Sequence, residues 1–269
     1  MTEAPLDAAQ LSAAVVRPGG LWRSVEVVPV TGSTNADLLA RAAAGEPEGA
    51  VLVAEQQDAG RGRLGRAWVS PPRAALTFSV LLRPAAVPRA LLGWLPLLAG
   101  VAVAAAVRDV AAVDAQLKWP NDVLAGPAKL AGILAEAAGD AVVIGIGLNV
   151  STGPADLPPP GPGALPATSL RLQGSPDPDR ERLLAGILAG LERRYRTWSR
   201  VSGDPERSGL RAEYTGLCAT LGRRVRVELP GGRLLDGLAA GVDADGRLLV
   251  SMPPDPDLAV AAGDIVHLR

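Results

Sequence analysis

The stretch between Ala54 and Trp68 has the residue types of an anion-binding loop. Its letters are AEQQDAGRGRLGRAW, so three arginines, Arg61, Arg63 and Arg66, alternate with three glycines. Glycine allows tight turns and close approach of the backbone to a ligand. Arginine offers a permanent charge and a planar set of donors that matches carboxylate or phosphate oxygens. The segment therefore predicts a flexible cationic loop that closes over an anion.

Two other interpretations of this loop fit less well. Gly60, Gly62 and Gly65 match the dinucleotide-binding pattern, but that pattern requires a helix at the glycines and an acidic residue about 20 positions later. Here the letters WVSPP follow, and no Asp or Glu occurs between Asp58 and Asp109. A single Arg-Gly segment that binds RNA is also not favoured, because the net charge of the chain is −1.

Composition predicts a globular protein with a sizeable core. The 269 residues suffice for one large domain, or for a medium and a small one, and they are 48% hydrophobic and 20% charged. Cys218 is the only cysteine and His267 the only histidine, so we expect no internal disulfide, no cysteine-based metal site and a reducing, cytoplasmic location. Residues 1–10 lack the apolar core of a secretory signal.

Residues 90–107 form the most apolar segment of the chain. Their length approaches that of a membrane span, which needs roughly 20 apolar residues. Pro96 interrupts the segment, alanine and glycine dilute it, and predicted strands flank it on both sides. We therefore expect a buried helix that covers a sheet, and no association with a membrane.

The remaining pattern predicts an α+β fold. Strands that follow one another closely, with fewer helices than a βαβ arrangement needs, indicate a mixed sheet with helices packed on one face. Strands are expected at 24–30, 50–54, 76–82, 116–119, 129–136 and 141–150, and helices at 36–41, 90–107 and 179–201. Residues 152–167 are rich in proline and glycine and form either a plain loop or a lid over a ligand.

From Leu221 onward the sequence alternates in short segments. Strands at 224–229, 234–242, 247–250 and 265–268, with turns at 230–232 and 243–246, predict a small antiparallel barrel of the SH3-like type. We therefore expect two domains. The larger one, over residues 1–215, is expected to be the catalytic domain, and the smaller one, over residues 216–269, is the C-terminal β domain.

Five motifs in order resemble those of the biotin–protein ligase family. They are GSTN at 32–35, AEQQDAGRGRLGR at 54–66, KWPND at 118–122, KLAGILAE at 129–136 and GIGLN at 145–149. The resemblance runs from about Val25 to the end of the chain. Many bacterial members also carry an N-terminal DNA-binding domain, for which residues 1–23 are too few. We therefore expect no binding to operator DNA.

The resemblance implies a fold related to class II synthetases, followed by the SH3-like module. It implies an enzyme that converts biotin and ATP, with Mg²⁺, into biotinyl-5′-adenylate and pyrophosphate. The biotin would then pass to one lysine of the biotin carboxyl carrier domain of acyl-CoA carboxylase or pyruvate carboxylase. The oligomeric state is not indicated by the sequence.

The resemblance also implies a set of site residues. Lys129 and Arg63 are the expected catalytic residues. Biotin is expected to contact Ser33, Thr34, Asn35, Gln57, Arg61, Gly62, Arg63 and Lys129. ATP is expected to contact Arg63, Arg66, Trp68, Asn121 and Asn149. Attack of a carboxylate on a phosphate brings two anions together, and each hydrogen bond to a charged group offsets ~1.5–3 kcal/mol of that repulsion.

Several of these residues have a second interpretation that the sequence leaves open. Asp122 either helps to place magnesium or caps the turn that contains it. Ser33 and Thr34 fit a helix cap, which is compatible with contacts to the ureido ring of biotin. Asn149 fits either an adenine contact or a turn, and Lys129 fits a solvated strand end. Trp68 and residues 132–134 are candidate apolar walls for biotin.

Two rival functions are consistent with the expected fold. A lipoate ligase or octanoyltransferase also acylates a carrier lysine, although the Arg-Gly loop and KWPND favour biotin. A biotin-binding sensor without activity is a second alternative, which the retained arginines and Lys129 disfavour.

Overall fold

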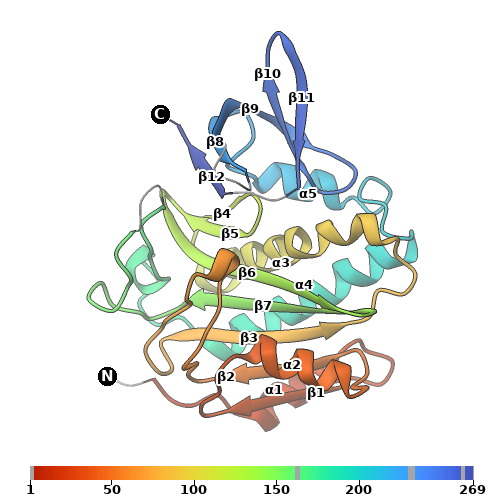
Figure 1. Ribbon diagram of the computed structural model, residues 1–269. Helices are drawn as coiled ribbons and strands as arrows, with labels where there is room; N and C mark the ends of the chain where they lie inside the picture. Colours follow the sequence, from red (N-terminus) through yellow and green to blue (C-terminus); the bar gives the residue numbers. More distant parts are fainter. Residues whose placement is uncertain (1–2, 161–163, 230–233, 262–263, 269) are drawn as a thin grey trace.

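The computed structural model describes residues 3–160, 164–229, 234–261 and 264–268. Its larger unit is a seven-stranded sheet with the strand order β1-β2-β3-β7-β6-β5-β4 (Figure 1). β1 and β2 are parallel, and every other neighbouring pair is antiparallel, so the sheet is mixed, as predicted. The strands are β1 (Ser24–Val28), β2 (Ala50–Ala54), β3 (Ala75–Leu82), β4 (Ala115–Lys118), β5 (Asp122–Ala125), β6 (Ala128–Ala138) and β7 (Ala141–Asn149).

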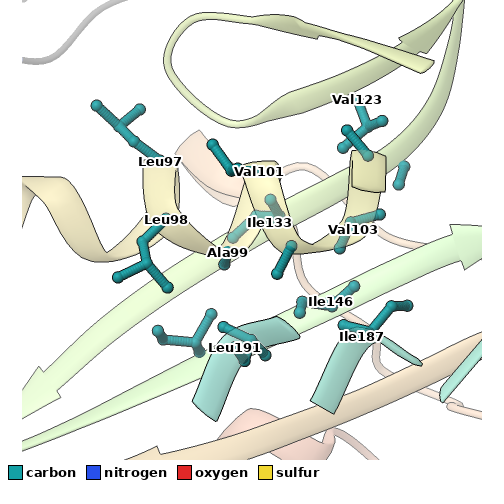
Figure 2. Close-up of a cluster of buried hydrophobic side chains, with 14 of the residues drawn as sticks. Leu97, Leu98, Ala99, Val101, Val103, Val123, Ile133, Ile146, Ile187 and Leu191 are labelled. Carbon is teal, nitrogen blue, oxygen red and sulfur yellow. The ribbon is translucent and has the colours of Figure 1, made fainter. Parts of the chain in front are cut away.

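Two long helices cover one face of this sheet. α3 (Trp94–Ala111), preceded by the short helix η2 (Arg89–Gly93), packs on α4 (Arg180–Arg200), and both contact the sheet. Figure 2 shows Leu98 of α3 and Leu191 of α4 in the same buried cluster as Ile146 of β7. A third helix, α1 (Ala8–Val15), packs on α4 and β1.

The apolar segment at Arg89–Ala111 is long and apolar enough to cross a membrane, with a mean hydropathy of 2.2. However, 67% of the most apolar 18-residue stretch of this segment is buried inside the protein, where the helix packs on α4 and the sheet. This burial agrees with the prediction of a core helix. The observed helix ends at Ala111, four residues beyond the predicted end.

The prediction that the helices lie on one face holds for α1, α3 and α4, but not for α2 (Thr34–Ala43). Leu38 of α2 packs on Leu52, Leu81 and Val143 in a separate apolar cluster on the opposite face. The reason is visible in β2, in which all five residues are buried. A strand that is buried on both faces has a continuous run of apolar residues, and other elements must pack on each of its two faces.

α2 also begins earlier than the sequence indicated. Ser33 is its N-cap, and its hydroxyl accepts a hydrogen bond from the amide of Ala36 at 3.4 Å. Thr34 and Asn35 therefore belong to the first helical turn, whereas the helix was expected to start at Ala36. This turn directs both residues toward the sheet, where they are 2% and 4% exposed.

The C-terminal unit is a five-stranded antiparallel sheet. Its order is β11-β10-β9-β8-β12, so in the described residues the two edge strands do not pair and the sheet is not a closed barrel. β11 was not foreseen, because the letters DPDLAV contain a proline and do not alternate. The predicted turn at 230–232 lies outside the described residues. The strands are β8 (Arg224–Glu228), β9 (Leu234–Val242), β10 (Leu248–Met252), β11 (Asp255–Val260) and β12 (Asp264–His267).

The C-terminal unit is anchored to the first by buried and partly buried hydrogen bonds. The amide of Trp119 donates to the Thr220 hydroxyl at 3.1 Å, and its indole donates to the carbonyl of Gly246 at 3.0 Å. The indole of Trp94 donates to the carbonyl of Ala244 at 2.7 Å. The predicted domain boundary between residues 215 and 216 falls inside α5 (Leu210–Leu217), and it stays a prediction.

Candidate active site

A cavity of about 210 Å³ opens between the sheet, the start of α2 and the Arg-Gly loop. The structure brings together every residue that was expected to contact biotin or ATP, and their individual roles stay predictions. The lining includes Ser33, Thr34, Asn35, Gln57, Arg61, Gly62, Arg63, Arg66, Trp68, Asn121, Lys129 and Asn149.

The floor of the cavity is made possible by glycine in two neighbouring strands. Gly132 of β6 pairs with Gly147 of β7, and Leu134 pairs with Gly145. A Cβ atom on Gly147 would lie 2.3 Å from the Trp68 ring, and one on Gly145 would lie 2.2 Å from Oδ1 of Asn35. The glycines of GIGLN therefore admit two side chains that line the site, since glycine in a strand allows close approach of neighbouring groups.

The Arg-Gly loop is folded as a narrow hairpin at one side of the cavity. Its arms are joined by hydrogen bonds from Trp68 N to Gly60 O at 2.9 Å and from Gly62 N to Arg66 O at 2.6 Å. A Cβ atom on Gly60 would lie 2.4 Å from the carbonyl oxygen of Trp68, so only glycine fits there. Leu64 at the tip has φ 56 and is 72% exposed.

One end of the cavity is neutral and polar. The Gln57 side-chain oxygen accepts from the amide of Thr34 at 2.8 Å and lies 3.0 Å from the Thr34 hydroxyl. The Asn35 side chain donates to the carbonyl of Leu134 at 3.2 Å. These contacts join GSTN to the Arg-Gly motif. Both interpretations of Ser33 and Thr34 are therefore structurally compatible, because the cap and the cavity lining coexist.

Two residues at this end were not assigned from the sequence. Ser79 is fully buried, and its hydroxyl donates to Oδ1 of Asn35 at 2.6 Å. Glu136 accepts from Nδ2 of Asn35 at 2.7 Å. Period-two alternation along β3 could have placed Ser79 on the same face as Thr77, which lines the cavity. Glu136 belongs to the quoted KLAGILAE motif, but nothing local distinguishes it.

The other end of the cavity is cationic. The ammonium of Lys129 forms an ion pair with Oδ1 of Asp122 at 2.6 Å, while its side chain remains 31% exposed. The guanidinium of Arg63 donates to Oδ1 of Asn121 at 3.1 Å. Asn121 in turn donates to the carbonyl of Ile133 at 2.9 Å. The KWPND turn thus supplies a partner to each of the two expected catalytic residues.

Asp122 was given two interpretations, and its contacts add an ion pair to them. Asp122 begins β5 and forms an ion pair with Lys129, and its Oδ2 lies 3.9 Å from the ammonium of Lys118. Among the described residues, no group of three or more His, Cys, Asp or Glu side chains could hold a metal ion. The ion pair with Lys129 is therefore an additional contact of Asp122, and the choice between a magnesium ligand and a turn cap stays open.

Asn149 and Trp68 border the cavity at its expected nucleotide side. The side-chain amide nitrogen of Asn149 donates to the carbonyl of Thr168 at 2.9 Å. This hydrogen bond ties the end of β7 to the residue that follows the proline-rich segment 152–167. The backbone of Lys129 is also tied there, through hydrogen bonds with Pro166 and Thr168. The indole nitrogen of Trp68 is buried and has no hydrogen-bond partner within the described residues.

Comparison with known proteins agrees with this geometry. The model of the biotin/lipoate A/B protein ligase family matches residues 27–149, and that of the biotin protein ligase C terminal domain matches residues 220–268. The chain is 46% identical, over 269 residues, to a biotin--[acetyl-CoA-carboxylase] ligase of Mycobacterium tuberculosis. That match covers 98% of this chain and 97% of the relative.

Solved structures show the same fold. The biotin protein ligase of Aquifex aeolicus, in complex with biotin and ATP, has a TM-score of 0.77 and 26% identity, and the match covers 92% of this chain and all of that chain. The Leishmania major enzyme in complex with biotinyl-5-AMP has a TM-score of 0.60 and 26% identity, over 91% of this chain and 98% of that one. The chain belongs to the biotin/lipoate A/B protein ligase family. Within that family it is a biotin protein ligase, which confirms the predicted enzyme class.

Proposed function

We propose that this enzyme forms biotinyl-5′-AMP from biotin and ATP and transfers the biotin to a specific lysine of a biotin carboxyl carrier domain. The observation that carries the proposal is the division of one cavity into a neutral polar end at Thr34 and Asn35 and a cationic end at Lys129 and Arg63. Biotin has the same division, with a ureido ring at one end and a carboxylate at the other.

In the first step, a carboxylate oxygen of biotin attacks the α-phosphorus of ATP. The bond to the β-phosphate breaks, and pyrophosphate leaves with its electron pair. Negative charge accumulates where the two anions meet, so fixed donors at that point stabilise the transition state. Lys129 and Arg63 line this part of the cavity, each held by a residue of the KWPND turn.

Magnesium accompanies ATP in this proposal. Mg²⁺ usually keeps several waters and is bound through phosphates and one or two carboxylates. Asp122 is the carboxylate nearest to Lys129 and is engaged by it, and the described residues offer no cluster of three or more ligands. Magnesium would therefore be held mainly by the ATP phosphates, and its charge would offset theirs.

In the second step, the amine of the acceptor lysine attacks the acyl carbon of the mixed anhydride, and AMP leaves. The name of the Mycobacterium tuberculosis relative supports a carrier domain of acetyl-CoA carboxylase as the acceptor. Pyruvate carboxylase is proposed as a second source of acceptor. A cytoplasmic location is part of the proposal, because both carboxylases and a free thiol such as Cys218 fit a reducing compartment.

The Gly60–Arg66 segment is proposed to become ordered over the adenylate. Such closure would shield the anhydride from water. The glycine content of the segment and its exposed tip at Leu64 motivate this proposal. Hydrogen exchange should show increased protection of the amides at 60–66 when biotin and ATP are added. Unchanged protection would contradict closure.

One assay tests the proposed function. Purified protein mixed with biotin, ATP and Mg²⁺ should release pyrophosphate, and a carrier domain added afterwards should become biotinylated. Lipoate and octanoate serve as controls for the rival acyl substrates. Release of pyrophosphate with lipoate and none with biotin would favour the lipoate-ligase alternative. Tight biotin binding without release would favour the sensor.

A further inference from the structure

Two segments from distant parts of the chain border the cavity. The Arg-Gly loop lines it with Arg61, Arg63 and Arg66, and the proline-rich segment lines it with Pro158 and Leu165, among others. Both segments have to be held in place at their ends if the cavity is to keep its shape.

The bases of the two segments are joined by backbone hydrogen bonds. Across the base of the Arg-Gly loop, the amide of Arg73 donates to the carbonyl of Glu55 at 2.9 Å. The carbonyl of the next residue, Ala74, accepts from the amides of Val150 at 3.1 Å and Ser151 at 2.9 Å, just before the proline-rich segment begins. A group that holds this base therefore acts on both segments.

Residues 3–6, which form a clasp, reach the base of the proline-rich segment through Glu3. The Glu3 carboxylate forms an ion pair with Arg171, four residues beyond that segment, at 2.5 Å. The same guanidinium donates to the carbonyl of Ser151, immediately before the segment, at 3.2 Å. Arg171 therefore connects the two ends of the segment, and Glu3 fixes the orientation of Arg171.

The clasp reaches the base of the Arg-Gly loop through its backbone. The amide of Leu6 donates to Oε1 of Glu55 at 2.6 Å, and Arg180 donates to the carbonyl of Ala4 at 2.5 Å. Arg180 also forms an ion pair with Glu55 at 2.6 Å. Leu6, Glu55 and Arg180 are at most 8% exposed. These contacts are therefore shielded from water, which strengthens them.

We propose that the clasp positions the Arg-Gly loop and the proline-rich segment over the bound adenylate and thereby slows its escape before transfer to the acceptor lysine. The inference rests on the proposed function, and it assigns a role to residues that do not line the cavity. A segment opens less often when more contacts hold its base, because the free energy of local opening rises with those contacts. An adenylate that leaves the cavity is lost to the second step.

Deletion of residues 2–5, so that Met1 is followed directly by Leu6, tests the proposal. The deletion removes the contacts of Glu3 and Ala4 but keeps the Leu6 amide. With biotin, ATP and Mg²⁺ and no carrier domain, biotinyl-5′-AMP should appear in solution about tenfold faster than from wild type, as expected for the loss of a hydrogen bond to a charged group. The initial burst of pyrophosphate should stay close to that of wild type, because no residue that lines the cavity is changed.

Two single substitutions keep the length of the chain. Glu3→Gln removes the charge that holds Arg171 and should raise the escape rate about threefold, because a partly exposed ion pair contributes less than a buried one. Glu206→Gln is the matched control, since Glu206 pairs with Arg211 at the same 2.5 Å and neither residue lines the cavity. It should leave the escape rate unchanged. If the deletion variant does not fold, Glu3→Gln alone decides, and an unchanged escape rate for it overturns the proposal.

Hydrogen exchange of the free protein gives a readout that does not depend on catalysis. In the deletion variant, the amides at 60–66 and 164–168 should exchange faster than in wild type, because the segments open more often. The amides of β9, in the C-terminal unit, should keep their protection. Unchanged exchange in both segments would contradict the role of the clasp.

The outcomes separate this inference from the proposed function. If wild-type protein releases no pyrophosphate with biotin, the proposed function fails and the inference fails with it. If wild type is active and the deletion variant retains its adenylate as long as wild type does, the inference fails alone. A lowered melting temperature with an unchanged escape rate would show that the clasp only stabilises the fold, and it would also overturn the inference.

Discussion

Lys129 illustrates how one side chain depends on its neighbours for a chemical role. Its ammonium is held by Asp122 at 2.6 Å, and its backbone is held by Pro166 and Thr168. A lysine on a flexible stem gains little from charge alone, since it must be oriented before the reaction to stabilise a developing charge. Asp122 and the strand pairing of β6 supply that orientation.

Replacement of Lys129 tests this role at the residue scale. Lys129→Ala should slow pyrophosphate release by ~10²–10³-fold, as expected for the loss of one donor to the transition state. Stability should change little, because the side chain is partly exposed. Lys129→Arg retains the charge but not the geometry and should recover part of the rate. A near-normal rate for Lys129→Ala would contradict the assignment.

At the scale of elements, the site depends on two strands that lack side chains where they meet. Gly132 and Gly147 are paired neighbours, and the Trp68 ring lies over them. Glycine weakens a strand, but here the adjacent strands β3 and β6 hydrogen-bond to β7 along its length. The sheet can therefore tolerate glycine at the positions where a ligand and an aromatic ring need space.

Gly147→Ala tests this requirement. The added methyl group would lie 2.3 Å from the Trp68 ring, so the ring has to move away. Overpacking of this kind costs about 1–3 kcal/mol, and we expect the KM for ATP in pyrophosphate release to rise by about tenfold. Gly241→Ala in β9 is the matched control, because its nearest neighbour would lie 3.9 Å away. Equal effects of the two substitutions would contradict the proposed contact.

At the scale of the whole molecule, a buried ion pair joins distant parts of the chain. Arg180 at the start of α4 contacts Glu55 at 2.6 Å, and the two side chains are 6% and 7% exposed. Glu55 also accepts from the amide of Leu6 at 2.6 Å, and Arg180 donates to the carbonyl of Ala4. The N-terminal segment, the base of the Arg-Gly loop and α4 are therefore held together.

Arg180→Leu should strongly destabilise the protein. Removing one partner of a buried ion pair costs about 3–5 kcal/mol, because the other charge is left without a partner. Arg182→Leu is the control, since Arg182 is exposed in the same helix. Denaturant unfolding measures both. A similar unfolding free energy for the two variants would show that Glu55 finds another partner.

His267 gives the contact between the two sheets a dependence on pH. Burial, together with the positive charges of Lys118 and Arg223, lowers the pKa of His267 from 6.5 to about 4. Its ring nitrogen lies 3.0 Å from the Thr220 hydroxyl, which also binds Trp119. Because the unfolded chain binds this proton more readily, the contribution of His267 to stability is complete above pH 6.5 and is lost as the pH falls toward 4.

Urea unfolding of wild type and His267→Asn at several pH values checks this expectation. Asparagine can hydrogen-bond to Thr220 but does not titrate in this range. Relative to the variant, the wild type should lose unfolding free energy between pH 6.5 and 4, and the difference should be constant above and below that window. A constant difference across the whole range would contradict the assigned pKa.

The sequence by itself determined the chemistry of this protein and most of its elements. Strand patterning and the apolar runs are local properties, and they predicted the mixed sheet and the core helix. The five ordered motifs predicted the residues that meet in the cavity through their resemblance to the biotin–protein ligase family. They also allowed the biotin protein ligase family to be recognised. These features are readable because their physical meaning depends on residue type and short spacing.

Only the tertiary structure decided which side chains support those residues. The place of α2 on the opposite face and the hydrogen bonds of Ser79 and Glu136 with Asn35 join residues far apart in the chain. The pairing of Asp122 with Lys129 spans only seven residues, but it depends on the pairing of β5 with β6. The open C-terminal sheet, with its proline-containing strand β11, likewise depends on which strands lie next to one another. Such contacts are set by packing across the sheet, and no local pattern records them.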